Sequence, residues 1–210
     1  MPTAVTSTAP TTYQPSAEFA QQAKTWADLG YPVSDATLQS LQGFLAQLSP
    51  VEPTRECVPF VLVVPSAARP ATEAMARIAL RGKPGTVNQH AGDIDEFTAA
   101  PGFEVPATAA YLLVDVERGS EFCGTPPEAA EAVLADRGRT PLTVAEGIAL
   151  VTLHPEVLEK NHCFSLAGSR KGDRRVPALW ISKGAPHLGW CFAGVPHSWL
   201  GLASAGDRHT

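Results

Sequence analysis

Charge is scarce in this sequence. Charged residues make up 18% of the 210 residues, below the roughly 25% usual in soluble domains. With 44% hydrophobic residues, the chain has enough apolar side chains for a core, which excludes wholesale disorder. Acidic residues outnumber basic ones by 21 to 16, a net charge of -5 that argues against a nucleic-acid partner. The longest apolar runs, such as 58–64, are far shorter than the roughly 20 residues of a membrane span, so no membrane partner is expected.

Several catalytic and cofactor-binding motifs are also missing. The chain has neither GxGxxG nor GxxxxGK[ST], the glycine-rich loops that hold dinucleotides and nucleotide phosphates. It lacks the GxSxG turn of serine hydrolases and the HExxH motif of zinc proteases. We therefore expect no organic cofactor.

The cysteines and the first residues bear on the compartment. The four cysteines, at positions 57, 123, 163 and 191, are widely spaced and form no CxxC pair. The first residues have neither the cationic start nor the apolar stretch of a secretory signal. Scattered cysteines without an export signal are typical of reduced thiols. The sequence therefore predicts a cytoplasmic protein.

Composition divides the chain into three parts. Residues 1–17 are rich in Thr, Ser, Ala and Pro and are expected to form a disordered arm. Residues 18–205 are expected to form a single α+β domain, with a helical hairpin over 18–50 and a sheet-containing core over 55–205. Residues 206–210 contain no apolar side chain and are expected to form a loose tail.

Apolar spacing predicts the helical hairpin. Helix 18–29 places Phe19, Ala23, Trp26 and Ala27 on one face, and a second helix follows Ser34, a typical N-cap. That second helix carries a leucine stripe at 38, 41, 45 and 48. Because a hairpin cannot bury such a stripe alone, we expect it to pack on the sheet or to form a homodimer.

Short apolar runs predict the strands of the core. Runs at 58–64 and 110–116 are expected to be buried strands, and three shorter runs at 163–166, 176–181 and 188–192 indicate an antiparallel sheet. A helix is expected over 70–80, followed by a turn at 82–85. Capping boxes at 125–128 and 143–146 predict two more helices. The expected fold is α+β, with the hairpin packed on a mixed, largely antiparallel sheet that has flanking helices.

Five segments carry a family resemblance. They are TPLTVAEGIALV (140–151), EKN (159–161), GSRKGDRRVPALWI (168–181), APHLGWC (185–191) and PHSWLG (196–201). With these segments the chain resembles an actinobacterial family known only as a domain of unknown function. The resemblance runs from about Val58 to Ala205, and 168–201 is its most specific part. It implies a soluble α+β fold and assigns no catalytic residue.

Basic residues gather in the last third of the chain. Between Lys160 and Lys183, six basic residues face a single acid, Asp173, which leaves a local charge of +5. Two interpretations stay open. The turn is either a solvated hairpin tip, or an anion site in which Arg170, Arg174 and Arg175 hold a carboxylate or phosphate.

Aromatic and histidine residues gather in the same region. Three of the four tryptophans, Trp180, Trp190 and Trp199, lie there, together with His187 and His197. Such side chains can line a pocket for an unsaturated ligand and move its protons. The alternative is an aromatic core with histidines at its rim.

Other polar residues complete the candidate set. Asp115 lies inside an apolar run and is the preferred acid/base carboxylate. Cys191 is a possible nucleophile paired with His197, or a buried, inert thiol. Cys163, Cys191 and His197 are a lower-ranked zinc alternative, because their spacing matches no standard zinc site.

These observations favour a small enzyme over two alternatives. The enzyme would use acid/base chemistry for a cyclisation, isomerisation or elimination on a small anionic substrate, with His197 or His187 moving the proton. The first alternative is a non-catalytic module that binds a ligand or another protein. The second is the zinc-binding protein.

Overall fold

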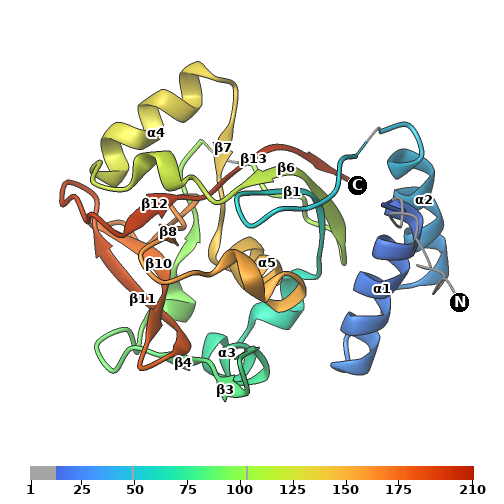
Figure 1. The fold of residues 1–210 in the computed structure, drawn as a ribbon, viewed down its shortest axis with the longest axis horizontal. Coiled ribbons are helices and arrows are strands. Elements are labelled where there is room, and N and C mark those ends of the chain that lie inside the picture. The colour runs from blue at the N-terminus through green and yellow to red at the C-terminus, as the bar shows by residue number, and fades with distance from the viewer. Residues whose placement is uncertain (1–12, 49, 103) are drawn as a thin grey trace, which may run out of the picture.

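The computed structural model describes residues 13–48, 50–102 and 104–210, and shows β-sheets at the centre with helices around them (Figure 1). The helices are α1 (Pro15–Asp28), α2 (Asp35–Leu45), α3 (Ala71–Arg77), α4 (Pro127–Asp136) and α5 (Val144–Leu153), with 3-10 turns η1 (Pro65–Ala68), η2 (Ile94–Glu96), η3 (Ser120–Phe122) and η4 (Pro155–Val157). The strands are β1 (Cys57–Val63), β2 (Ala79–Leu80), β3 (Lys83–Pro84), β4 (Thr86–Val87), β5 (Thr98–Ala99), β6 (Tyr111–Glu117), β7 (Thr140–Pro141), β8 (Cys163–Ser165), β9 (Ser169–Arg170), β10 (Arg175–Ser182), β11 (Ala185–Phe192), β12 (Leu200–Leu202) and β13 (Ser204–His209). The predicted α+β class is confirmed. No helix among the described residues is long and apolar enough to cross a membrane.

The first large sheet has four strands in the order β1-β6-β13-β7, and all its pairs are antiparallel. Its two longest strands, β1 and β6, are the two predicted buried runs. They pair from Val58 opposite Val116 to Val63 opposite Tyr111. Strand β1 is almost entirely buried, β6 is buried over residues 111–113 and at Val116, and together they supply much of the core.

The second large sheet has five strands in the order β12-β8-β10-β11-β4. Its middle strands β8, β10 and β11 are antiparallel, as predicted, whereas β12 and β4 join the two edges in parallel. The chain passes from this sheet to the first one at Ala203, which lies between β12 and β13. Ala203 is therefore the shortest of the links that the chain makes between the two large sheets.

The helical hairpin packs on the exposed edge of the first sheet. Trp26 of α1 donates its indole N–H to the carbonyl of Leu62 at 2.8 Å, and the Gln22 side chain accepts the N–H of Leu62 at 2.7 Å. An edge strand has unpaired backbone groups that otherwise invite pairing with another chain. Side chains of α1 thus satisfy part of the β1 edge. The leucine stripe of α2 is covered within the chain, since Leu41 and Leu45 are buried.

Two predicted boundaries of the chain are wrong. Helix α1 begins at Pro15, so residues 15–17 belong to the helix and not to an arm, while 1–12 lie outside the described residues. The expected loose tail at 206–210 is strand β13 as far as His209, and it pairs with β6. Although residues 206–210 have no apolar side chain, backbone pairing with β6 and polar contacts hold this segment in place. Its His209 ring stacks on Phe44 of α2, with ring centroids 3.3 Å apart.

A buried carboxylate ties β13 to the core. Glu146 in α5 has no solvent exposure and accepts bonds from Arg208 of β13, at 2.5 Å to Oε1 and 2.9 Å to Oε2. The Tyr111 hydroxyl donates to it at 2.8 Å and the Thr143 N–H at 2.7 Å. Burying a carboxylate costs several kcal/mol unless charge and hydrogen bonds compensate. Arg208 supplies that compensation from the end of the chain.

The two predicted capping boxes have different outcomes. The box of Thr143 and Glu146 is confirmed, since each side chain bonds the other's backbone N–H. The box predicted at 125–128 is wrong, because α4 begins at Pro127 and its N-cap, Pro126, makes no side-chain cap bond. Glu128 instead forms an ion pair with Arg174 at 2.9 Å. The helix expected over 70–80 is also shorter, because Ala79 begins strand β2.

Deleting residues 206–210 tests the role of Arg208. We expect a loss of about 3–5 kcal/mol in the free energy of unfolding, because the deletion leaves the Glu146 carboxylate buried without its cation. Urea denaturation measures the loss. Deleting Thr210 alone, which is exposed and lies beyond β13, is the matched control and should leave the midpoint unchanged. Equal midpoints for both deletions would contradict a structural role for β13.

Candidate functional site

Four rings that the sequence singled out form one cluster. It runs from His187 to Trp180, Trp199 and His197, and we call it the aromatic surface. The ring centroids of successive members are 4.9, 6.2 and 5.4 Å apart. All four side chains are half-buried, so the rings pack on one another and still meet solvent.

The register of β10 and β11 creates the centre of this surface. Trp180 lies directly opposite His187, and cross-strand partners project from the same face of a sheet. Gly189 lies two residues further along β11 than His187, and so on that same face. A Cβ at Gly189 would overlap Cη2 of Trp180, so the indole ring lies across the glycine. The missing side chain therefore lets Trp180 lie against the sheet.

The same sheet face is closed at its other end. Val176 and Cys191 form the cross-strand pair there, and both are buried. Helix α4 is anchored at this end, because Glu128 donates its N–H to the carbonyl of Ala193 at 3.0 Å. Figure 1 shows α4 at one end of β10 and β11, and strands β3 and β4 at the other. Trp180 and His187 thus lie on the part of the face away from α4, whereas Trp199 and His197 come from the segment that leads into β12.

His187 is held in a defined orientation. Its Nδ1 lies 2.7 Å from the Thr86 hydroxyl on β4, and this is its one hydrogen bond among the described residues. Burial lowers the pKa of the His187 imidazole below the ordinary 6.5. The ring is therefore neutral at pH 7 and has Nε2 available for a ligand.

Cys191 does not reach the histidines. Its thiol lies on the buried end of the face, 3.7 Å from the Ser165 hydroxyl. Burial raises the pKa of this thiol above its ordinary value, which keeps it protonated at neutral pH. The structure therefore places the proposed nucleophile away from His197 and in a form that is poorly reactive.

The three candidate arginines are engaged in ion pairs. Arg170 lies 2.5 Å from Glu131, and Arg174 lies 2.9 Å from Glu128, both on α4. Arg175 pairs with Asp93 at 2.8 Å and with Asp173 at 2.7 Å. The local excess of positive charge in the sequence is thus matched by acids from α4 and from the loop before η2. Each of these arginines thus already has a carboxylate partner within the chain.

Arg175 also determines where Trp190 lies. Its guanidinium stacks over the rings of Trp190 and Phe97, at 5.1 and 5.6 Å from their centroids. Trp190 is three residues from His187 along β11, so it projects from the opposite face of the sheet. The sequence grouped Trp190 with the other tryptophans, but the structure separates it from the aromatic surface.

Asp115 lies in the other large sheet. It is on β6 with φ of 52°, an unusual value for a residue other than glycine, and its side chain is 53% exposed. Arg139 holds its carboxylate at 2.5 Å. The structure therefore does not bring this candidate acid/base carboxylate together with the histidines.

The zinc alternative is contradicted by geometry. Cys163 is buried in β8, Cys191 is buried in β11, and His197 belongs to the aromatic surface. Across the described part of the chain, no three His, Cys, Asp or Glu residues are grouped closely enough to hold a metal ion. The three residues therefore offer no shared zinc site.

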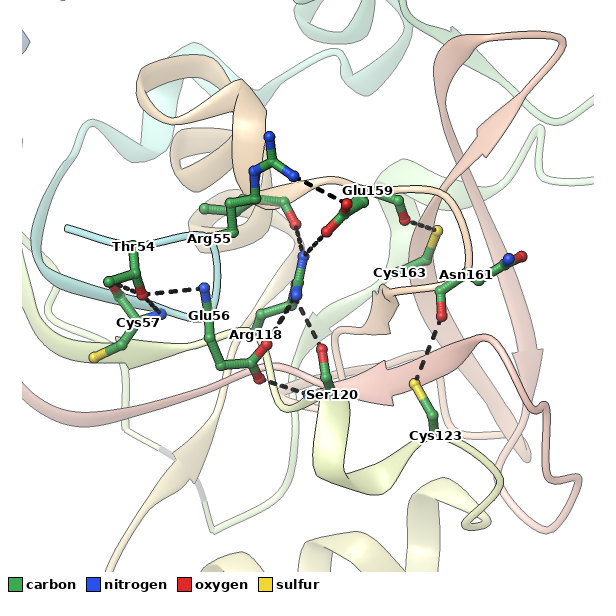
Figure 2. Close-up of polar contacts among 11 residues, drawn as sticks. Thr54, Arg55, Glu56, Cys57, Arg118, Ser120, Cys123, Glu159, Asn161 and Cys163 are labelled. Atoms are coloured by element: carbon green, nitrogen blue, oxygen red, sulfur yellow. Dashed lines mark hydrogen bonds and ion pairs between the residues drawn. The ribbon is translucent and has the colours of Figure 1, made fainter.

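A second polar network was not predicted from the sequence. Arg118, at the end of β6, is only 7% exposed and bonds Glu56, Glu159 and the carbonyl of Val157 (Figure 2). Ser120 donates its backbone N–H to Glu56 at 2.8 Å, and together with Arg118 it lowers the pKa of that carboxyl. Each polar group of Arg118 has a protein partner, so the network joins three segments of chain and has no free donor directed at a ligand.

Two cysteines flank that network. Figure 2 shows the thiols of Cys123 and Cys163 against the backbone of the loop at 159–161, at 4.0 Å from the Asn161 carbonyl and 3.4 Å from the Glu159 carbonyl. Burial raises the pKa of both thiols. They are protonated at neutral pH and serve as donors to the loop.

The His187 titration can be measured directly. We expect its NMR midpoint to lie below 6.5 in the folded chain and near 6.5 in urea, because burial disfavours the charged ring. The spectrum of His187→Gln identifies the signal. Since the folded pKa is the lower one, the contribution of His187 to stability is complete above pH 6.5 and is lost as pH falls through the folded value. A folded midpoint above 6.5 would contradict the burial of this ring.

Comparison with known proteins identifies the family and assigns no activity. A family of unknown function, DUF5701, matches residues 25–210, which includes most of the helical hairpin as well as the two sheets. No curated protein and no solved structure matches the chain significantly. Because the match covers far more than half of the sequence, the protein belongs to the DUF5701 family.

Proposed function

We propose that the protein binds a small molecule with a planar, unsaturated ring on the aromatic surface. The observation that carries this proposal is the position of Trp180, whose indole lies across Gly189 in a row with Trp199 and two histidines. A planar ligand can stack on such rings, and stacking of a base on an aromatic side chain is worth about 1–3 kcal/mol.

The surroundings support binding at this end of the sheet. At the other end of the same face Val176 and Cys191 are buried, and the Cys191 thiol lies 3.7 Å from the Ser165 hydroxyl. The aromatic surface is only half-buried, and the Thr86 hydroxyl is its one side-chain hydrogen-bond partner among the described residues. Neutral His187 can accept a hydrogen bond from a ligand through Nε2, which adds direction to the stacking.

Acid/base catalysis is the second candidate function, and the state of His187 favours it. Thr86 fixes Nδ1, and burial keeps the ring neutral, so Nε2 can take a proton at pH 7. On this view the protein would catalyse a cyclisation, isomerisation or elimination of the bound ligand without an organic cofactor. His197, at the other end of the row, would return the proton. Substitution of His187 by Gln would then abolish turnover and leave ring binding largely intact.

A cytoplasmic location and a homodimer remain parts of the proposal. The first rests on four cysteines that are free thiols. The sequence suggests a homodimer through the leucine stripe of α2, but Leu41 and Leu45 of that stripe are buried within the chain. A dimer through the hairpin would therefore have to use the polar outer faces of α1 and α2.

Calorimetric titration with 1-naphthol, indole and adenosine tests the proposed binding. We expect at least one of these rings to bind with a Kd below about 1 mM, and Trp180→Ala to weaken that binding about tenfold through the loss of stacking. Trp190→Phe is the matched control, because Trp190 lies on the opposite face and should not affect the Kd. Failure of all three rings to bind, or an equal effect of both variants, would refute the proposal.

A further inference from the structure

We infer that the ligand of the aromatic surface also carries an anionic group, bound by Arg81, Lys83 and Lys183 at the neighbouring tip of the five-stranded sheet. This inference rests on the proposed function and names its ligand class: a planar ring that bears a phosphate or a carboxylate. The three cations differ from the arginines that the sequence had suggested for this role.

Two hairpin turns form this tip. The turn between β2 and β3 is Arg81-Gly82, with φ of 53° and 76°, and the turn between β10 and β11 is Lys183-Gly184, with φ of 51° and 81°. Two-residue turns with positive φ at both positions favour Asn-Gly or Asp-Gly. Here a cation occupies the first position of both turns, where a residue with a Cβ is strained. Strain of this kind is often found at functional sites.

The two turns lie against each other. Lys83 donates from Nζ to the carbonyl of Lys183 at 2.9 Å, and its side chain passes Gly184. Three cations are thereby gathered at one place, and all three residues are exposed. Within the described chain none of the three forms an ion pair with a carboxylate. The tip therefore keeps its positive charge, in contrast to the ion-paired arginines at the α4 end.

The tip adjoins the aromatic surface. Lys183, in the turn after β10, follows Trp180 by three residues, about 10 Å along an extended chain. Lys83 lies on β3, and Thr86 of β4, which bonds His187, follows it by three residues. A lysine side chain can span most of that distance, so one small molecule can place its ring on Trp180 and its anion at the tip. Lysine and arginine both suit an anionic oxygen, the arginine in two-pronged geometry.

The cations have an alternative explanation that predicts a different result. Basic residues at sheet edges also prevent pairing with another chain. If that were their whole role, they would not distinguish between an anionic and a neutral ring. The double variant Arg81→Asn/Lys183→Asn separates the two roles, because asparagine suits the turn better and should not lower the melting temperature.

Calorimetry with 1-naphthyl phosphate, 1-naphthol and inorganic phosphate tests the inference. In the natural chain we expect naphthyl phosphate to bind about tenfold more tightly than naphthol, and this difference to shrink as salt is raised from 50 to 500 mM. In the double variant the two ring compounds should bind equally. The matched control is Lys24→Gln/Arg137→Gln, which removes the same charge from ion pairs elsewhere and should preserve the difference.

The outcomes separate this inference from the proposed function. Equal binding of naphthol and naphthyl phosphate in the natural chain overturns the anion subsite and leaves ring binding intact. A loss of the difference in the control variant also overturns it, because the effect would then come from net charge. Binding of phosphate alone, as tight as that of naphthyl phosphate, would support the anion subsite and overturn ring binding. Binding of none of the three compounds overturns both.

Discussion

The buried carboxylate of Glu146 is the constraint on which much of this structure depends. A charge with no solvent exposure needs a cation and hydrogen-bond donors, and the cation, Arg208, comes from the last strand of the chain. Because that bond holds β13 against β6, the end of the chain becomes an inner strand of the first sheet. The helix that carries Glu146 is in turn fixed by its cap, Thr143. The cap of α5 and the attachment of β13 to the sheet therefore both depend on the Glu146 carboxylate.

Features that depend on residues close together in the sequence could be predicted, whereas features that depend on distant residues could not. Strands β1 and β6 and the cap at Thr143 are local patterns, and the structure confirms them. The strand at 204–209 could not be predicted from the sequence, because Glu146, the partner of Arg208, lies 62 positions away. The box predicted at 125–128 failed for a similar reason, since Glu128 pairs with Arg174 from a distant hairpin. Apolar content alone could not reveal a strand that is held by polar contacts.

The candidate site shows the same division between local pattern and distant contact. Trp180 and His187 are neighbours because a two-residue turn fixes their register, and that pairing needs only the local hairpin. Trp190 was grouped with them by proximity in sequence, although a period of two places it on the opposite face. The sequence cannot show that the arginines are ion-paired, because their acidic partners come from α4 and from residue 93. The sequence indicates which side chains could bind a ligand. Contacts between residues distant in the sequence determine which of those side chains already have a partner within the chain.

The two ends of the five-stranded sheet thus use their charges in different ways. At the α4 end, every arginine between 170 and 175 faces a carboxylate, and Asp93 is bonded so firmly by Lys171 and then Arg175 that its pKa is lowered to about 2. Cations so neutralised stabilise the fold and have little attraction left for a ligand. At the opposite tip, Lys183 and its neighbours have no carboxylate partner among the described residues and adjoin the half-buried rings. A solvated cation without an ion-pair partner costs the fold little stability, and it can attract an anionic ligand. We therefore propose that the ligand's anionic group binds at this tip of the sheet rather than in the basic turn.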